Sequence, residues 1–156
     1  TQLPDGVKII GNLPYYISSR ILFRLLEVDK WDIMVLMFQK EVAQRIVLEP
    51  NNKSYGRLSV MCQVYCDVKS IFTVSKHVFQ PKPNVDSSVL VFLPKKMNLP
   101  NINQFSEFIK QAFSKRRKKL KNNLPELYNR GLLKEWGDNR PEEITPDQYV
   151  KIYLLI

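Results

Sequence analysis

The segment from residue 7 to residue 26 constrains the fold of this chain more than any other. Residues 7–10 are mostly β-branched and apolar, which predicts a buried strand. A short turn with Asn12 and Pro14 follows, and Ser18 or Ser19 then stands where it can cap a helix. That helix has one apolar face, which a sheet or another helix must cover. The face consists of Ile21, Leu22, Leu25 and Leu26.

The turn between strand and helix carries residue types that fit a planar base. In open α/β sheets, ligands sit beyond the carboxyl ends of strands, which is where this turn falls. Asn12 offers a side-chain carbonyl, and Pro14 favours an extended Leu13 whose own carbonyl can turn outward. Tyr15 supplies a flat ring. Two carbonyls that hold both N–H bonds of an aromatic amine would make its nitrogen more nucleophilic without a general base. The alternative is an ordinary strand-to-helix turn in which Tyr15 packs.

The next ninety residues alternate between strand and helix patterns. The almost continuous apolar run at 32–38 predicts a strand buried on both faces. Helical patterns follow at 40–49 and 57–66, and β-rich runs at 68–75 and 87–94. This alternation predicts an α/β fold.

The segment 77–86 is a second candidate for base binding. Pro81 and Pro83 make it stiff and extended, so it can present Phe79 at low entropic cost. Phe79 would stack on the base opposite Tyr15. The alternative is that Phe79 fills the core end of a strand.

Beyond Pro94 the pattern is helical. Apolar residues recur at helical spacing from Phe105 to Leu124, which predicts one helix interrupted by a basic run at 115–119. Arg116 and Arg117 follow Phe113 by three and four positions and are therefore expected on or beside the apolar stripe. There they would face a cleft between two domains and grip RNA phosphates. The alternative is a solvated surface charge run.

Composition narrows the class of partner. The net charge is +9, which favours a polyanion, nucleic acid before membrane. No apolar run approaches the length of a membrane span. Because the chain has one histidine, a zinc site with Cys62 and Cys66 is improbable, and both are expected to be buried free thiols in a reducing cytoplasm.

Four ordered motifs point to one family. Asn12-Leu13-Pro14-Tyr15 followed by Ile17-Ser18-Ser19 resembles the target-base motif of the small-subunit rRNA adenine N6-dimethyltransferases. The segments 39–45, 55–60 and 79–87 agree in order, and residues 113–124 resemble that family's first C-terminal helix. The resemblance covers nearly the whole chain.

The resemblance implies a fold and an activity. The fold would be the C-terminal half of a Rossmann-like class I methyltransferase sheet in residues 1–96, followed by a small all-α RNA-binding domain in residues 97–156. The activity would be methyl transfer from S-adenosyl-L-methionine to N6 of two adjacent adenosines near the 3′ end of small-subunit rRNA. The implied setting is a cytoplasmic monomer that uses no metal and no membrane.

The resemblance also implies roles for individual residues. Asn12 and the Leu13 carbonyl would hold the adenine N6 in the turn shaped by Pro14, Tyr15 and Phe79 would stack on the base, and Asn12 would also lie close to the cofactor. The residues implied in RNA binding are Arg57, Lys115, Arg116, Arg117, Lys118, Lys119 and Lys121.

One departure and three rival functions stand beside this interpretation. The family's Gly-rich cofactor loop and acidic residue have no counterpart in this sequence, so we expect a fragment that is inactive alone and binds S-adenosylmethionine weakly.

The rivals are a macrolide-resistance (Erm-type) methyltransferase of large-subunit rRNA, a non-catalytic ribosome-assembly or RNA-binding module, and a DNA adenine methyltransferase. The motif at Gly56 and Arg57 and the basic run favour the small-subunit enzymes.

Overall fold

The computed structural model describes residues 6–28, 30–95 and 100–156. The chain forms two compact units. The first contains Thr1–Val47 and Tyr65–Lys95, and the second contains Leu48–Val64 and Lys96–Ile156. The domain division expected between residues 96 and 97 stays a prediction; by its contacts, the segment 48–64 belongs with the C-terminal residues.

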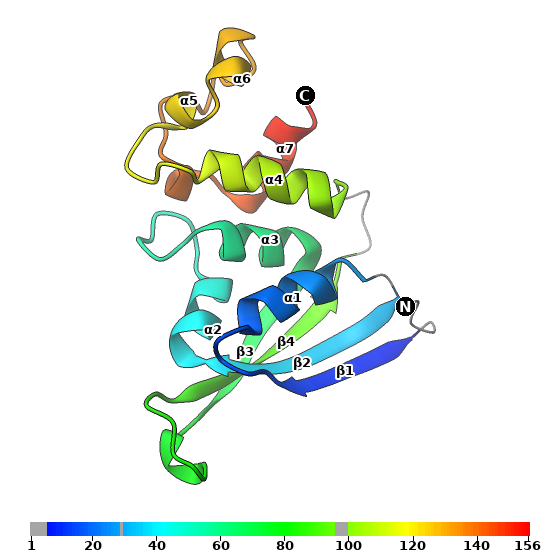
Figure 1. The fold of residues 1–156 in the computed structure, drawn as a ribbon. Helices are drawn as coiled ribbons and strands as arrows, with labels where there is room; N and C mark the ends of the chain where they lie inside the picture. Colours follow the sequence, from blue (N-terminus) through cyan, green and yellow to red (C-terminus); the bar gives the residue numbers. More distant parts are fainter. Residues whose placement is uncertain (1–5, 29, 96–99) are drawn as a thin grey trace. The chain divides into compact units, whose positions relative to one another are not determined.

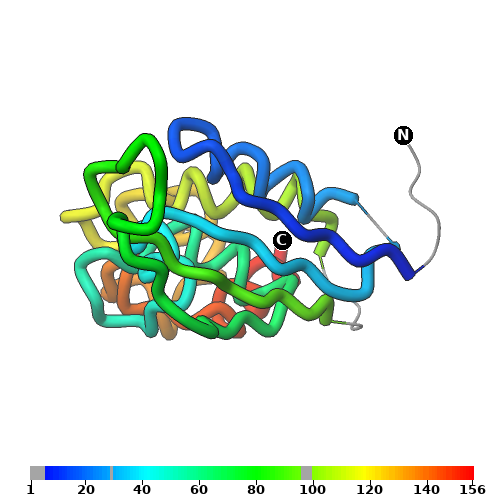
Figure 2. Tube along the Cα trace, turned by 90° about the horizontal axis from the view of Figure 1, so that it is seen from below, coloured from blue at the N-terminus to red at the C-terminus, as the bar shows by residue number. Residues whose placement is uncertain are grey.

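The first unit is built on a four-stranded sheet with the order β1-β2-β4-β3 (Figure 1). The strands are β1 (Val7–Asn12), β2 (Trp31–Gln39), β3 (Cys66–Val74) and β4 (Ser87–Pro94). β1 and β2 are parallel, whereas β4 is antiparallel to both β2 and β3. Figure 2 shows β1 and β2 running side by side. Because β1 and β2 are parallel, their carboxyl ends, Asn12 and Gln39, lie at the same edge of the sheet.

Strand β2 supplies much of the core of this unit. Met34, Leu36 and Phe38 are fully buried, while the alternate residues on the other face of the strand are half-buried. The expected burial on both faces is therefore complete on one face only. The short helix α2 (Lys40–Val47) continues directly from β2 and buries Ala43 and Ile46.

Helix α1 (Ser18–Leu26) follows the turn after β1. It buries Leu22 and Leu26, as its apolar pattern predicts. The expected capping by Ser18 or Ser19 is wrong, because no side chain caps this helix. Ser18 is instead its first residue, and the Ser18 hydroxyl donates a hydrogen bond to the Tyr15 carbonyl (3.2 Å).

The second unit is helical. Its helices are α3 (Arg57–Tyr65), whose last residue belongs to the first unit, α4 (Ile102–Ala112), α5 (Leu120–Asn123), α6 (Pro125–Asn129) and α7 (Pro146–Tyr153). Helix α7 begins with the expected cap: the Thr145 hydroxyl accepts from the Gln148 amide, and the Gln148 side chain accepts from the Thr145 amide.

Aromatic side chains fill the core of the second unit. Phe105 packs edge-on against Tyr153, with ring centroids 5.3 Å apart. The buried hydroxyls find acceptors, since Tyr55 donates to the Ile144 carbonyl (2.9 Å) and Tyr149 to the Pro141 carbonyl (2.8 Å). Burial without compensating charge raises the pKa of both phenols above the ordinary value.

The expected single helix over 105–124 is wrong. Helix α4 ends at Ala112, residues 114–118 form turns, and α5 starts at Leu120. The buried Asn123 amide donates to the Ala112 carbonyl (2.6 Å) and to the Lys115 carbonyl (3.3 Å), which stabilises this helix end. Like charges four residues apart, as at Lys115 and Lys119, also disfavour continuing the helix.

The two cysteines are buried thiols outside any disulfide, as expected, with Cys62 on α3 and Cys66 at the start of β3. Over the residues that the structure describes, no three His, Cys, Asp or Glu side chains are grouped to hold a metal. No helix in those same ranges has the length and apolarity to cross a membrane.

Candidate functional site

A pocket of about 330 Å³ opens at the carboxyl end of β1. It brings together two segments that are far apart in the sequence, the turn after β1 and the loop before β4. All five residues expected to be catalytic lie in its wall. The lining residues are Asn12, Leu13, Pro14, Tyr15, Phe79, Pro81 and Pro83. Pockets of this size hold small planar ligands.

Asn12 is fixed by its backbone and free at its side chain. It ends β1 opposite Met37, and the next amide, that of Leu13, donates to the Met37 carbonyl (3.3 Å). The Leu13 side chain is buried, which anchors the turn. The Asn12 side chain is exposed and makes no hydrogen bond within the described ranges. Its amide is therefore available to a ligand.

Tyr15 is held at both ends. Its hydroxyl lies 2.6 Å from the Ser87 hydroxyl, and Ser87 is fully buried at the start of β4. Its own carbonyl accepts from Ser18. The ring is half-buried. Ser18 and Ser87, which sequence reasoning did not assign to the site, thus orient a ring that lines the pocket.

Phe79 enters the pocket from a closed loop. It ends a short 3₁₀ turn (Lys76–Val78) and is half-buried. The Asp86 carboxylate accepts from the Lys76 amide (3.0 Å), and the Asp86 carbonyl accepts from the Lys40 amide (2.9 Å). These bonds tie the two ends of the loop to each other and to α2. A half-buried ring in the pocket wall fits stacking better than it fits core filling.

The basic run at 115–119 lies on a turn, so Arg116 and Arg117 are not on the apolar stripe of a helix as expected. Both side chains are exposed. Arg116 donates from Nη2 to the carbonyls of Lys53 and Tyr55, the latter at 2.9 Å. Arg116 therefore joins two segments of the second unit.

Lys119 and Lys121 share one carboxylate. Their ammonium groups lie 2.9 and 2.8 Å from Asp138 Oδ1. The hydrogen bonds from Lys121 and Lys119 lower the pKa of Asp138 to about 2, and the same contact raises the pKa of Lys121. Lys121 also lies 5.5 Å from the centre of the Tyr128 ring.

Three of the seven residues expected to bind RNA have no internal partner for their side chains. These are Lys115, Arg117 and Lys118, which are exposed and form no side-chain hydrogen bond or ion pair with any described residue. Arg57, by contrast, is half-buried and donates to the Ser106 hydroxyl at 2.6 Å. Unpaired exposed cations of this kind are available to phosphates.

Comparison with known proteins gives one consistent result. A protein-family model for "Ribosomal RNA adenine dimethylase" matches residues 2–156. Two curated relatives are each called "Ribosomal RNA small subunit methyltransferase A". That of Blochmanniella floridana is 40% identical over 164 residues, which cover 100% of this chain and 60% of the relative. That of Prosthecochloris aestuarii is 47% identical over 125 residues, covering 79% and 48%. The chain therefore spans about half to three-fifths of the length of these relatives.

Solved structures agree on the fold. A dimethyladenosine transferase from Plasmodium falciparum superposes with a TM-score of 0.88 at 23% identity, covering 99% of this chain and 68% of that one. The 23S rRNA methyltransferase ErmE superposes with a TM-score of 0.70 at 20% identity, covering 99% and 67%. These likenesses confirm the expected Rossmann-like methyltransferase fold class. The family-model match over residues 2–156 establishes that the chain belongs to the ribosomal RNA adenine dimethylase family.

Proposed function

We propose that this protein transfers methyl groups from S-adenosylmethionine to N6 of two adjacent adenosines near the 3′ end of small-subunit rRNA. The observation that carries the proposal is the pocket that gathers Asn12, Leu13, Tyr15 and Phe79 from two distant segments. The small-subunit methyltransferases at 40% and 47% identity support this substrate over large-subunit rRNA, because the likeness to ErmE is 20%.

The proposed chemistry needs two carbonyls and two rings. The Asn12 side-chain carbonyl and the Leu13 main-chain carbonyl accept the two N–H bonds of the adenine amine. Tyr15 and Phe79 stack on the two faces of the base, which typically contributes about 1–3 kcal/mol per base. These hydrogen bonds hold both N–H bonds out of the plane of the ring. The N6 lone pair is then less delocalised into the ring and more available to attack the methyl group.

No general base is required in this proposal. The seven lining residues include no Asp, Glu, His or Lys, so positioning of the amine supplies most of the rate gain. When bound, S-adenosylmethionine supplies an electrophilic methyl group. The Asn12 side-chain amide is exposed at the end of β1 and has no hydrogen-bond partner among the described residues. This suits a side chain that contacts both the base and the cofactor. The proton that N6 loses passes to solvent through the open side of the pocket.

Binding of the RNA strand is assigned to the exposed cations of the second unit. Lys115, Arg117 and Lys118 would contact phosphates, and the net charge of +9 would add long-range attraction. Arg116, Lys119 and Lys121 would contribute charge but already have internal partners. We place the reaction in the cytoplasm, on the small ribosomal subunit or its precursor, with the protein acting as a monomer.

The test is methyl transfer by the protein as its gene encodes it. Labelled S-adenosylmethionine is supplied with undermethylated small subunits, large subunits or duplex DNA. The proposal predicts label in adjacent adenosines of small-subunit rRNA alone. Label in large-subunit rRNA would favour an Erm-type enzyme, label in DNA a DNA methyltransferase, and particle binding without transfer an assembly factor.

A further inference from the structure

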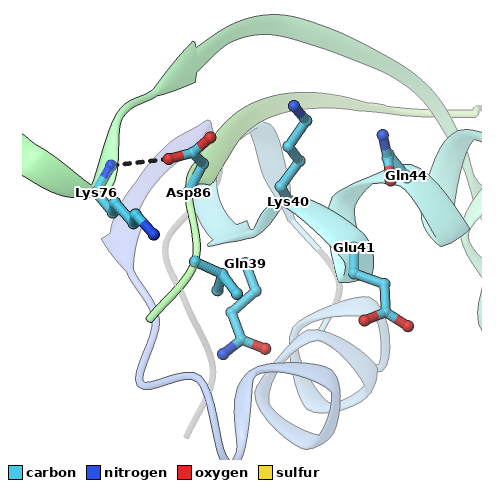
Figure 3. A pocket seen from close by; sticks show the side chains of 7 residues that line it. Gln39, Lys40, Glu41, Gln44, Lys76 and Asp86 are labelled. Carbon is cyan, nitrogen blue, oxygen red and sulfur yellow. Dashed lines mark hydrogen bonds between the residues drawn. The ribbon is translucent and has the colours of Figure 1, made fainter. Parts of the chain in front are cut away.

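A second pocket, of about 380 Å³, lies beside the carboxyl end of β2 (Figure 3). The chemistry proposed above does not use it. Its two lysines and two glutamines come from two separate segments of the first unit, residues 39–44 and Lys76. Its lining residues are Gln39, Lys40, Glu41, Gln44, Lys76, Val85 and Asp86.

The two pockets are neighbours on one sheet edge. The carboxyl ends of the parallel strands β1 and β2 meet there, one leading into each pocket. One loop contributes to both pockets, because Pro81 and Pro83 line the base pocket and Val85 and Asp86 line the second. Ser87, which follows Asp86, pairs with Gln39 in the sheet and holds the Tyr15 hydroxyl. The second pocket is therefore placed where a nucleotide next to the base in the first pocket could bind.

The second pocket contains two lysines and two carboxylates, and neither lysine forms an ion pair with a described residue. The Glu41 carboxylate is engaged by Arg45 one turn later, and the Asp86 carboxylate accepts the Lys76 amide. The Lys76 ammonium donates to a main-chain carbonyl, that of Asn84 at 3.4 Å. With Glu41 engaged by Arg45, the ammonium groups of Lys40 and Lys76 remain to bind an anionic ligand.

The amide side chains add donors and acceptors next to these cations. Gln44 lies one turn after Lys40, and Figure 3 shows the two side chains extending from the same side of α2. Gln39 reaches the pocket from the end of β2. Amides of this kind can pair with the edge of a base, and glutamine suits adenine in particular.

We propose that this second pocket is a subsite for the nucleotide that adjoins the target adenosine. Lys40 and Lys76 bind its phosphate, and Gln44 and Gln39 contact its base edge. The inference rests on the proposed function, since it assigns a neighbour to the base held by Asn12 and Tyr15. It gives the enzyme a means of recognising adjacent adenosines as a pair.

The experiment compares the double variant Lys40→Gln, Lys76→Gln with the double variant Lys8→Gln, Lys69→Gln, a charge-matched control at exposed positions of β1 and β3. Affinity for undermethylated small subunits is measured at several salt concentrations with the full protein. One lost phosphate contact on a single strand should flatten the plot of log affinity against log salt by about 0.7. We expect about tenfold weaker binding at low salt and an unchanged midpoint of thermal unfolding. The control should match the unmodified protein.

An affinity and a salt slope equal to those of the control would overturn the subsite while leaving the proposed function intact. If the unmodified protein binds particles without transferring methyl groups but the double variant loses slope, the subsite stands and the proposed function fails. If the unmodified protein binds no RNA, both fail. A photoreactive nucleotide placed next to the target adenosine provides a check that needs no variant: it should crosslink within 39–44 or at Lys76, Val85 or Asp86, and crosslinks only outside these positions would contradict the proposal.

Discussion

Replacing Arg116 separates the structural part of the basic run from its RNA-binding part. Arg116→Met keeps the aliphatic stem and removes both hydrogen bonds to the carbonyls of Lys53 and Tyr55. Arg117→Met is the matched control, because Arg117 is exposed with no internal partner for its side chain among the described residues. The two variants change the net charge equally, so a difference between them reports the contacts alone.

The magnitude follows from those two bonds. Hydrogen bonds to charged groups contribute about 1.5–3 kcal/mol each. The bond to Lys53 is exposed, and immobilising the arginine costs about 2 kcal/mol of side-chain entropy. We therefore expect Arg116→Met to lower the unfolding free energy by about 1.5 kcal/mol, which corresponds to a melting shift of about 3–6 °C in a protein of this size. Arg117→Met should stay within about 0.5 kcal/mol.

Thermal and urea unfolding measure the loss of stability in each variant, and the dependence of RNA affinity on salt measures the loss of phosphate contacts. Arg117→Met should flatten the salt dependence by about 0.7–0.9, as expected for one phosphate contact, whereas Arg116→Met should leave it nearly unchanged. Equal destabilisation by both variants, or a larger loss of salt slope in Arg116→Met, would refute the division of roles.

Three further predictions concern single side chains. Tyr15→Phe leaves the buried Ser87 hydroxyl without its 2.6 Å partner and should cost about 1–2 kcal/mol in unfolding; restoration by adding Ser87→Ala is the check, and no loss would show that the bond is not formed. Burial raises the pKa of the Cys66 thiol from 9.0 to about 12, so its stabilising effect is present below pH 9 and is lost as the pH rises towards 12. Native protein should accordingly resist iodoacetamide near neutral pH, and alkylation at the rate of a free thiol would contradict this. Asp138→Asn removes the ion-pair partner of Lys119 and Lys121, so affinity for RNA should increase. Stability should barely change, because both ion pairs are exposed. Weaker RNA binding by this variant would contradict the reasoning.

Local sequence patterns predicted the strand–turn–helix unit, the strand at Ser87–Pro94 and the cap at Thr145. In each case the residues that decide the structure lie within a few positions of one another. β-branching, the spacing of apolar residues and cap chemistry act over that range, so the sequence pattern suffices. The fold class followed from the same patterns together with the family motifs.

Long-range contacts explain what the sequence pattern did not reveal. The helix expected over 105–124 ends at Ala112, where the Asn123 side-chain amide donates to the last carbonyl of the helix. Arg116 bonds to carbonyls more than sixty residues earlier, and Tyr15 is oriented by Ser87. Nothing in local periodicity marks such partners. The second pocket is also assembled from three segments, so no single motif identifies it.

The central claim is that Asn12 holds the reacting amine, and one measurement tests it directly. Single-turnover methyl transfer to undermethylated small subunits is compared for the unmodified protein, Asn12→Ala, and Asn129→Ala as an exposed control on α6. Losing a group that acts on the transition state should slow transfer by at least about 100-fold in Asn12→Ala, with particle affinity within about twofold and the control unaffected. Transfer by Asn12→Ala at the unmodified rate would contradict the account.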